Sequence, residues 1–110
     1  MKLIYEKDIQ RDILSFLRLN KIFCWKNNNV GIYKKETGSY IPSQIQGISD
    51  IIGILPDGRF LAIEIKREGG KLTDKQIEFL NNIKKNNGLT IIAYSVKDVV
   101  EKLQEQGYLK

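Results

Sequence analysis

The sequence contains no histidine and only one cysteine, Cys24, among its 110 residues. Without histidine there is no imidazole for acid–base catalysis, for Ser-His or Cys-His nucleophile pairs, or for zinc sites that need it. A single cysteine cannot form a disulfide within the chain, and its apolar neighbours predict a small buried residue. Any catalysis must therefore use carboxylates, lysine, hydroxyl groups or a metal held by oxygen ligands, which favours Mg²⁺ or Mn²⁺.

Long hydrophobic runs are also missing. No apolar stretch approaches the ~20 residues of a membrane span, and the N-terminus lacks the apolar segment of a signal peptide. We therefore expect no membrane contact and a cytoplasmic location. The length predicts one domain over residues 1–110. Eighteen Lys and Arg against 13 Asp and Glu give a net charge of +5, which is compatible with a polyanionic partner.

The pattern of apolar and turn-forming residues predicts an α/β domain with the element order α-β-β-β-β-α-β-α. Helices are expected over residues 4–19, after the capping residue Thr73 to about residue 86, and after Ser95. Strands are expected over 21–25, 30–33 and 89–94, and on both sides of the turn at residues 56–58. Residues 34–47 are rich in Gly, Ser, Thr and Gln and predict a loop.

Two carboxylates interrupt the strands on either side of that turn. Asp50 and Glu64 both lie among apolar, β-branched residues. Charges in such strands cost several kcal/mol unless they are paired or bound to a metal. A divalent-metal site explains them, whereas the alternative is a solvent-facing strand surface on which Asp50 pairs with Lys66.

The turn Pro56-Asp57-Gly58 predicts how these residues face each other. It suits a three-residue loop with glycine at the left-handed position, which places Leu55 opposite Arg59. Counting back along both strands then puts Asp50 opposite Glu64, with Lys66 on the same face. A two-residue loop would instead shift the register by one and send Asp50 to the other face.

Two further polar residues belong to apolar helical stripes. Glu6 shares the stripe of Ile9, Ile13 and Leu17, so it either lies near the strand pair or only complements the helix dipole. Gln76 occupies position N3 of a capping box and also aligns with the inward face of its helix. The sequence leaves open whether Gln76 serves as a helix cap or as a site residue.

Together these residues resemble the signature of PD-(D/E)xK nucleases: Asp50, followed by Glu64-Ile65-Lys66. The wider pattern resembles the VRR-NUC branch, the virus-type replication-repair nucleases. That branch has Glu on the N-terminal helix, then Gly-x-x-Asp, Glu-x-Lys, and Gln on the next helix. The matching positions in this chain are Glu6, Gly47, Asp50, Glu64, Lys66 and Gln76. Ser49 stands where proline is frequent in the family.

The resemblance implies a restriction-endonuclease-like core, a central mixed sheet flanked by helices. It implies that Asp50, Glu64 and the backbone carbonyl of Ile65 bind Mg²⁺ or Mn²⁺, and that Glu6 does so directly or through water. Lys66 would orient the attacking water or neutralise developing charge, and Gln76 would position Lys66 or a second water. Cations expected to contact the DNA backbone are Lys26, Lys34, Lys35, Arg67 and Lys71.

The expected function is metal-dependent, structure-selective cleavage of DNA phosphodiester bonds. Small members of the branch look like phage proteins and are similar to Holliday-junction resolvases, which act on branched DNA as homodimers. A role in phage genome processing or DNA repair follows only from that resemblance. The alternatives are a monomeric nuclease for flaps or duplex, a non-catalytic DNA-binding module, and an interaction domain whose acidic face is structural.

Overall fold

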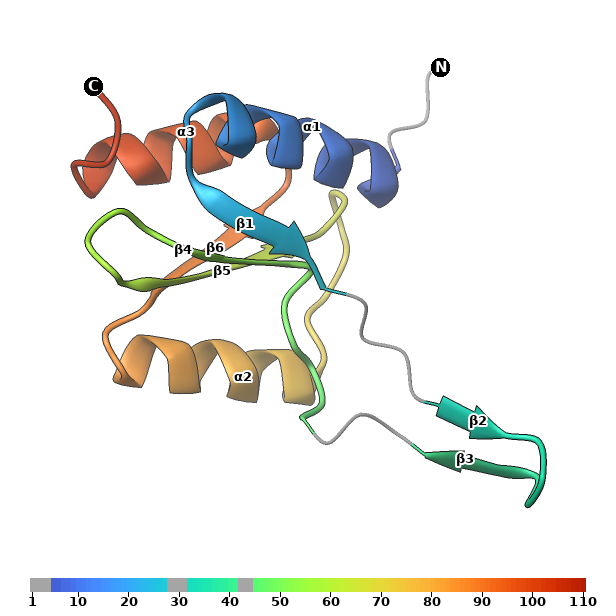
Figure 1. Cartoon of the computed structure of the whole chain (residues 1–110). Helices are drawn as coiled ribbons and strands as arrows, with labels where there is room; N and C mark the ends of the chain where they lie inside the picture. The colour runs from blue at the N-terminus through green and yellow to red at the C-terminus, as the bar shows by residue number, and fades with distance from the viewer. Residues whose placement is uncertain (1–4, 28–31, 42–44) are drawn as a thin grey trace.

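The fold is a mixed β-sheet with helices on both faces and a small hairpin at one side (Figure 1). The computed structural model describes residues 5–27, 32–41 and 45–110. Within these ranges the helices are α1 (Glu6–Leu19), α2 (Asp74–Lys85) and α3 (Val96–Glu105). The strands are β1 (Phe23–Lys26), β2 (Ile32–Lys34), β3 (Ser39–Ile41), β4 (Ile51–Ile54), β5 (Phe60–Ile65) and β6 (Leu89–Ala93).

The predicted α/β fold and order of elements are confirmed, with one additional strand. Residues 39–41, predicted to be loop, form β3 and pair antiparallel with β2. The polar residues between the two strands form a turn in which Gly38 has φ +67°. A glycine at that conformation permits a tight reversal, so a segment with loop-like composition becomes a hairpin. Residues 30 and 31 of the predicted strand lie outside the described residues.

The main sheet has the strand order β1-β4-β5-β6. The β1–β4 and β4–β5 pairs are antiparallel, whereas β5 and β6 are parallel, so the sheet is mixed as predicted. Helices α1 and α3 cover one face and α2 covers the other (Figure 1). This arrangement buries β5 on both faces, which explains why five of its six residues are apolar and why Glu64 is conspicuous there.

The core lies mainly between the sheet and the α1–α3 layer. Its fully buried side chains include Ile13 and Leu17 from α1, Leu61 and Ile63 from β5, and Leu103 from α3. Cys24 is buried in the same cluster, as predicted, and burial raises the pKa of its thiol. A smaller cluster under α2 is centred on three buried residues: Ile52, Ala62 and Leu80. No helix in the described ranges has both the length and the apolar character needed to cross a membrane.

The turn between β4 and β5 has the predicted register. Ile54 faces Phe60, and the Leu55 amide donates to the Arg59 carbonyl at 2.8 Å. Gly58 adopts φ +90°, the left-handed conformation that the three-residue loop requires. Since Ile51 pairs with Ile63 at the other end of the strands, the next position outward brings Asp50 opposite Glu64.

Gly47 lies in the segment before Asp50 and packs closely against the start of α2. Its φ is +76°, and a β-carbon there would meet the Lys75 carbonyl group and lie 2.6 Å from the Gln76 amide nitrogen. Gly58 has a similar φ of +90°, but a β-carbon there would meet nothing within 4 Å. An alanine at Gly58 would therefore report only the cost of positive φ. An alanine at Gly47 would report that cost together with the cost of a backbone collision.

We predict that Gly58→Ala lowers the free energy of unfolding by about 1 kcal/mol, the cost of placing alanine at positive φ. Gly47→Ala should lower it by about 3 kcal/mol or more, because collision with α2 adds to the same backbone cost. Urea unfolding of the two variants measures both values. Equal losses would show that the contact between Gly47 and α2 is not needed for packing.

Candidate active site

Asp50 and Glu64 meet where β4 begins and β5 nears its end. The Oδ2 atom of Asp50 accepts a hydrogen bond from the backbone N–H of Ile65 at 2.7 Å. The donor lies in β5 just beyond the last β4–β5 pair, Ile51–Ile63. The bond therefore fixes the Asp50 carboxylate against β5. Asp50 is half-buried, whereas Glu64 is only 2% exposed. The structure thus brings together the two carboxylates that the register predicted.

One oxygen of Glu64 has a partner and the other has none. Its Oε1 accepts a hydrogen bond from the Gln76 side-chain amide at 3.0 Å. Its Oε2 is buried and has no hydrogen-bond partner among the described residues. A buried carboxylate oxygen without a partner is costly, so such an atom indicates a missing ligand or proton.

The surroundings of Glu64 raise its pKa to about 8. Burial is the largest cause, followed by the charge of Asp50 and the direct contact between the two carboxyl groups. Glu6 adds a smaller effect in the same direction, and Lys66 opposes them with its positive charge. The pair is therefore unfavourable when both carboxyls are ionised and needs a proton or a cation between them.

Gln76 caps its helix and also contacts Glu64. Its backbone N–H donates to the Thr73 hydroxyl at 3.2 Å, and its Oε1 accepts from the Thr73 backbone at 2.9 Å. The capping box is therefore complete. Its remaining amide group is the donor to Glu64. Because the side-chain oxygen is held by the cap, the amide nitrogen is oriented toward the carboxylate.

Glu6 reaches the site from the exposed end of its stripe. Ile9, Ile13 and Leu17 are buried as the stripe predicts, but Glu6 in the first turn is exposed. Its Oε1 accepts a hydrogen bond from the backbone N–H of Arg67 at 3.2 Å, just beyond the end of β5. This contact connects α1 to the segment that follows Glu64 and Lys66.

A pocket of about 260 Å³ opens between these elements. It is lined by Glu6, Lys7, Gln10, Lys26, Asn27, Asp50 and Ile65. The side-chain nitrogen of Asn27 is buried and has no partner among the described residues, and its backbone N–H donates to the Asp50 carbonyl at 2.8 Å. The pocket therefore combines carboxylates with cationic and neutral donors.

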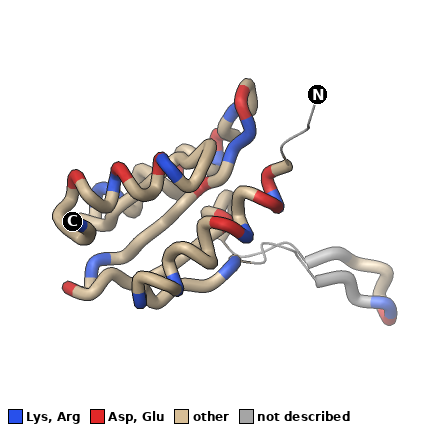
Figure 2. The backbone as a smooth tube through the Cα atoms, turned by 90° about the horizontal axis from the view of Figure 1, so that it is seen from above, with Lys and Arg blue, Asp and Glu red and all other residues tan. Residues whose placement is uncertain are grey.

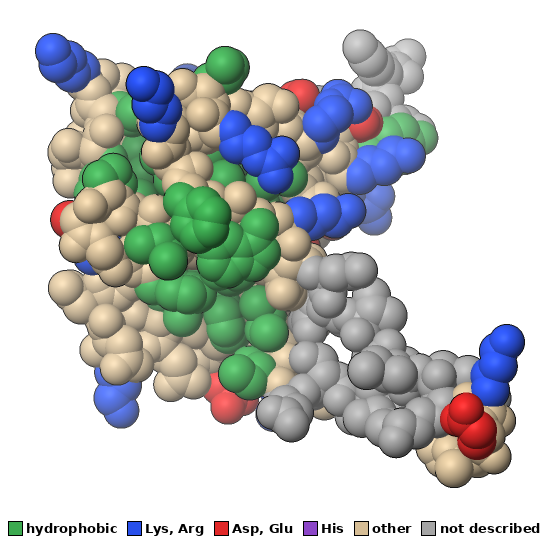
Figure 3. Space-filling model, in the orientation of Figure 1, with side chains coloured by type: hydrophobic (Ala, Val, Ile, Leu, Met, Phe, Trp, Pro, Cys, Tyr) green, Lys and Arg blue, Asp and Glu red, His purple; other side chains and the backbone are tan. Residues whose placement is uncertain are grey.

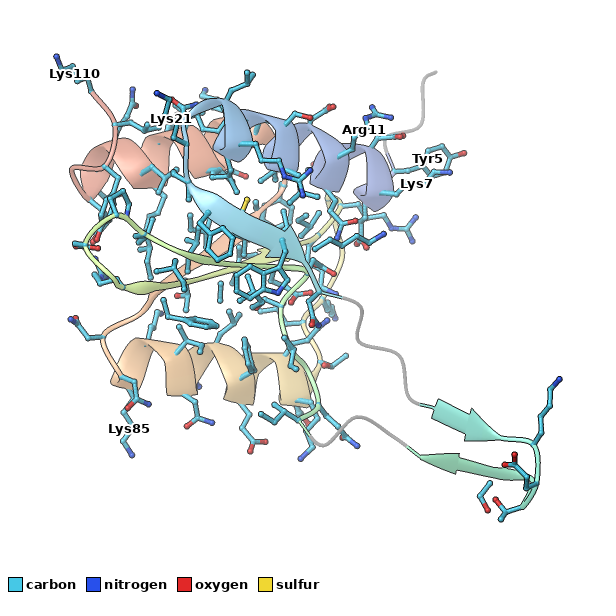
Figure 4. All side chains as sticks on the ribbon, viewed as in Figure 1. Tyr5, Lys7, Arg11, Lys21, Lys85 and Lys110 are labelled. Carbon is cyan, nitrogen blue, oxygen red and sulfur yellow. The ribbon has the colours of Figure 1, made fainter. Side chains whose placement is uncertain are left out.

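Three of these lining residues, Lys7, Gln10 and Asn27, were not predicted as site residues. Gln10 follows Glu6 by one helical turn, and Asn27 follows Lys26 directly. Their nearness to predicted site residues was the sequence signal that could have identified them. Figure 4 labels Lys7 close to Tyr5 at the N-terminal end of α1, where its ammonium group lies 5.9 Å from the centre of the Tyr5 ring.

The predicted DNA-contacting cations differ in where they lie. Lys26 lines the pocket, and Arg67 is beside it through its bond to Glu6. Lys35 and Lys71 are exposed and line no part of the pocket. The side chain of Lys34 lies outside what the structure describes. Lys35 belongs to the turn of the β2–β3 hairpin, which extends away from the sheet (Figure 1).

The donor set suits a hard divalent cation. Carboxylate and carbonyl oxygens are the ligands that Mg²⁺ and Mn²⁺ prefer, and the unpartnered Oε2 of Glu64 beside Asp50 is where a cation would relieve the repulsion. The described ranges contain no group of three His, Cys, Asp or Glu side chains arranged to hold a metal. Besides the two carboxylates, other ligands would have to be backbone oxygens or water.

Comparison with protein families matches the VRR-NUC domain over residues 6–97. The chain belongs to the VRR-NUC family. A solved structure described as a VRR_NUC domain protein is similar to this VRR-NUC chain with a TM-score of 0.68 at 20% identity, covering 99% of this chain and 95% of the other. A search of curated proteins gives no match. Membership indicates a nuclease of the PD-(D/E)xK type, which implies DNA as substrate, and such nucleases generally use divalent metals.

We predict that stability of the metal-free protein falls as pH rises from about 4.5 to about 8. In this window the folded protein keeps the Glu64 proton, since its pKa is about 8, while the unfolded chain releases it near the ordinary value of 4.5. The unfolded state then binds fewer protons, so the free energy of unfolding falls, by up to about 1.4 kcal/mol per pH unit.

Urea unfolding at several pH values in a metal chelator measures this slope for wild type and Glu64→Gln. The variant, which has no ionisable group at this position, should lack the Glu64 contribution. Glu68→Gln, at an exposed position, should behave as wild type. Identical slopes for wild type and Glu64→Gln would show that Glu64 titrates normally.

Proposed function

We propose that this VRR-NUC protein is a Mg²⁺- or Mn²⁺-dependent endonuclease that cuts branched DNA in the manner of a Holliday-junction resolvase. The observation that carries the proposal is the pair Asp50 and Glu64. Two carboxylates face each other with one buried oxygen unpartnered, beside an open pocket that also contains lysine side chains. A solvent-facing acidic surface would leave both carboxyl groups hydrated, whereas Glu64 is almost fully buried beside Asp50.

The residues suited to hold the ion are Asp50, Glu64 and the backbone carbonyl of Ile65. Glu6 also lines the pocket, bonded to Arg67, and would reach the ion directly or through water. An ion held there would lower the pKa of a coordinated water and would stabilise negative charge on the phosphate. The Asp50 and Glu64 carboxyl groups would hold the ion, and Glu64 would have to give up the proton that it keeps up to about pH 8 in the metal-free protein.

Lys66 and Gln76 have the two remaining roles in the proposed reaction. Lys66 follows Glu64 by two residues, so its side chain leaves the same face of the strand, and its backbone N–H is fixed by a bond of 3.0 Å to the Ala93 carbonyl. Its ammonium group orients the attacking water or neutralises the charge that develops on the phosphate. Gln76 holds Oε1 of Glu64, which leaves Oε2 for the ion.

Action on a four-way junction requires two active sites related by a two-fold axis, which a homodimer supplies. Support comes from edge strand β1, where Phe23 and Trp25 are 66% and 40% exposed and their rings lie 5.4 Å apart. Ile54, the cross-strand partner of Phe23, is also exposed. Hydrophobic side chains gather over the middle of the face shown in Figure 3. A patch of this kind favours contact with a second copy.

Cleavage of labelled DNA with Mg²⁺ or Mn²⁺ tests the substrate. We predict paired, symmetric cuts in a synthetic four-way junction and little cutting of linear duplex or a flap of the same sequence, because only the junction offers two equivalent strands to a symmetric dimer. Equal cutting of all three would instead indicate a monomeric, structure-tolerant nuclease. Binding without cutting would indicate a DNA-binding module.

We predict that Asp50→Ala and Lys66→Ala each reduce cleavage by about a hundredfold or more, because each removes charge that stabilises the reaction. DNA binding in a chelator should change little. The matched controls are Glu101→Ala and Lys97→Ala, an exposed pair on α3 with 3.7 Å between their charged groups, and both should cut normally. Full activity of either site variant would contradict the assignment.

A further inference from the structure

A second pocket, next to the one that Asp50 lines, is formed by α1 and the end of β1. It measures about 220 Å³ and shares Lys7, Gln10 and Lys26 with the first pocket, so the two form one continuous depression. We call it the α1–β1 groove; its polar lining residues are Lys7, Gln10, Arg11, Ser15, Arg18 and Lys26. One end of the groove therefore opens at the pocket that Asp50 lines.

The groove itself is lined by four cations and no carboxylate. Lys7, Arg11 and Arg18 recur at intervals of four and seven residues, which places them along one stripe of α1. Lys26 adds a fourth charge from the end of β1. Lys and Arg side chains gather around the N-terminal part of α1 and the end of β1 in Figure 3, although acidic positions also follow α1 in Figure 2.

The groove cations differ from most other helical lysines in their partners. Lys75, Lys97 and Lys102 each pair with a carboxylate on their own helix. Among the described residues, by contrast, no ion pair includes Lys7, Arg18 or Lys26. Arg11 is the exception in the groove, since it pairs with Asp8 and Asp12 at 3.4 Å. The other three cations, Lys7, Arg18 and Lys26, retain their charge for an external anion.

We propose that the α1–β1 groove binds the phosphate backbone of the DNA strand that enters the active site. The inference rests on the proposed nuclease function and names the path of its substrate. Gln10 and Ser15 supply neutral hydrogen-bonding groups between the cations, a mixture typical of phosphate contacts. Asn27 lines the pocket where the groove ends, and its buried side-chain nitrogen is a donor without a partner among the described residues.

The test is the salt dependence of DNA binding in a metal chelator, measured with the labelled junction and duplex. Lys7→Gln and Arg18→Gln should each weaken binding and lower the slope of log K against log salt by about 0.7 to 0.9, the value for one lost phosphate contact. The double variant should lose about twice that. Both side chains are exposed, so the fold should survive, and thermal unfolding checks this.

The matched controls are Lys84→Gln and Lys85→Gln, which remove the same charge from exposed positions near the end of α2; Figure 4 labels Lys85 there. Both should keep the wild-type slope. Equal loss in controls and groove variants would overturn the groove as the binding path and leave only a net-charge effect. Wild-type slopes in all variants, or no DNA binding by the wild type, would overturn it as well.

These results are separable from those on the proposed function. A wild-type protein that binds DNA through the groove but cuts no substrate would overturn the nuclease proposal and leave the groove supported. A wild-type protein that cuts DNA while the groove variants bind as it does would overturn the groove alone.

Discussion

The contact on which the site depends is the approach of two carboxylates, Asp50 and Glu64, across the start of β4 and the end of β5. Left ionised and alone they repel, and Glu64 is almost fully buried. Several features nevertheless keep them together: the register set by the Gly58 turn, the bond from the Ile65 N–H to Asp50, and the bond from Gln76 to Glu64. Because the fold holds the two carboxyl groups together in spite of their repulsion, a cation bound between them would stabilise the folded protein.

The rest of the structure serves this pair by bringing further elements to one end of the sheet. Gly47 allows the segment before Asp50 to lie against the first turn of α2, and the capping box there orients the Gln76 amide. On the other face, α1 reaches the chain just after β5 through the bond between Glu6 and Arg67. Packing of the α1–α3 layer thus positions Glu6 at the site, and packing of α2 positions Gln76.

Local rules predicted the carboxylate pair, because register follows from the turn type and a strand alternates with period two. They also predicted the helix cap at Gln76 and its inward-facing position, since one helical turn contains both features. Lys7 and Asn27 were missed because their place in the pocket depends on how α1 packs beside β1, a contact between segments separated in sequence. The β3 strand was missed because its composition is that of a loop and pairing with β2 decided its conformation.

The central claim, that Asp50 and Glu64 form a divalent-cation site, is tested most directly by thermal unfolding at neutral pH with increasing Mn²⁺. We expect the wild-type Tm to rise with Mn²⁺ concentration, because an ion that binds only the folded state stabilises it. Asp50→Asn and Glu64→Gln should lose most of this rise, whereas Glu101→Gln, at an exposed position on α3, should keep it. No rise in the wild type, or the same rise in all four proteins, would contradict the account.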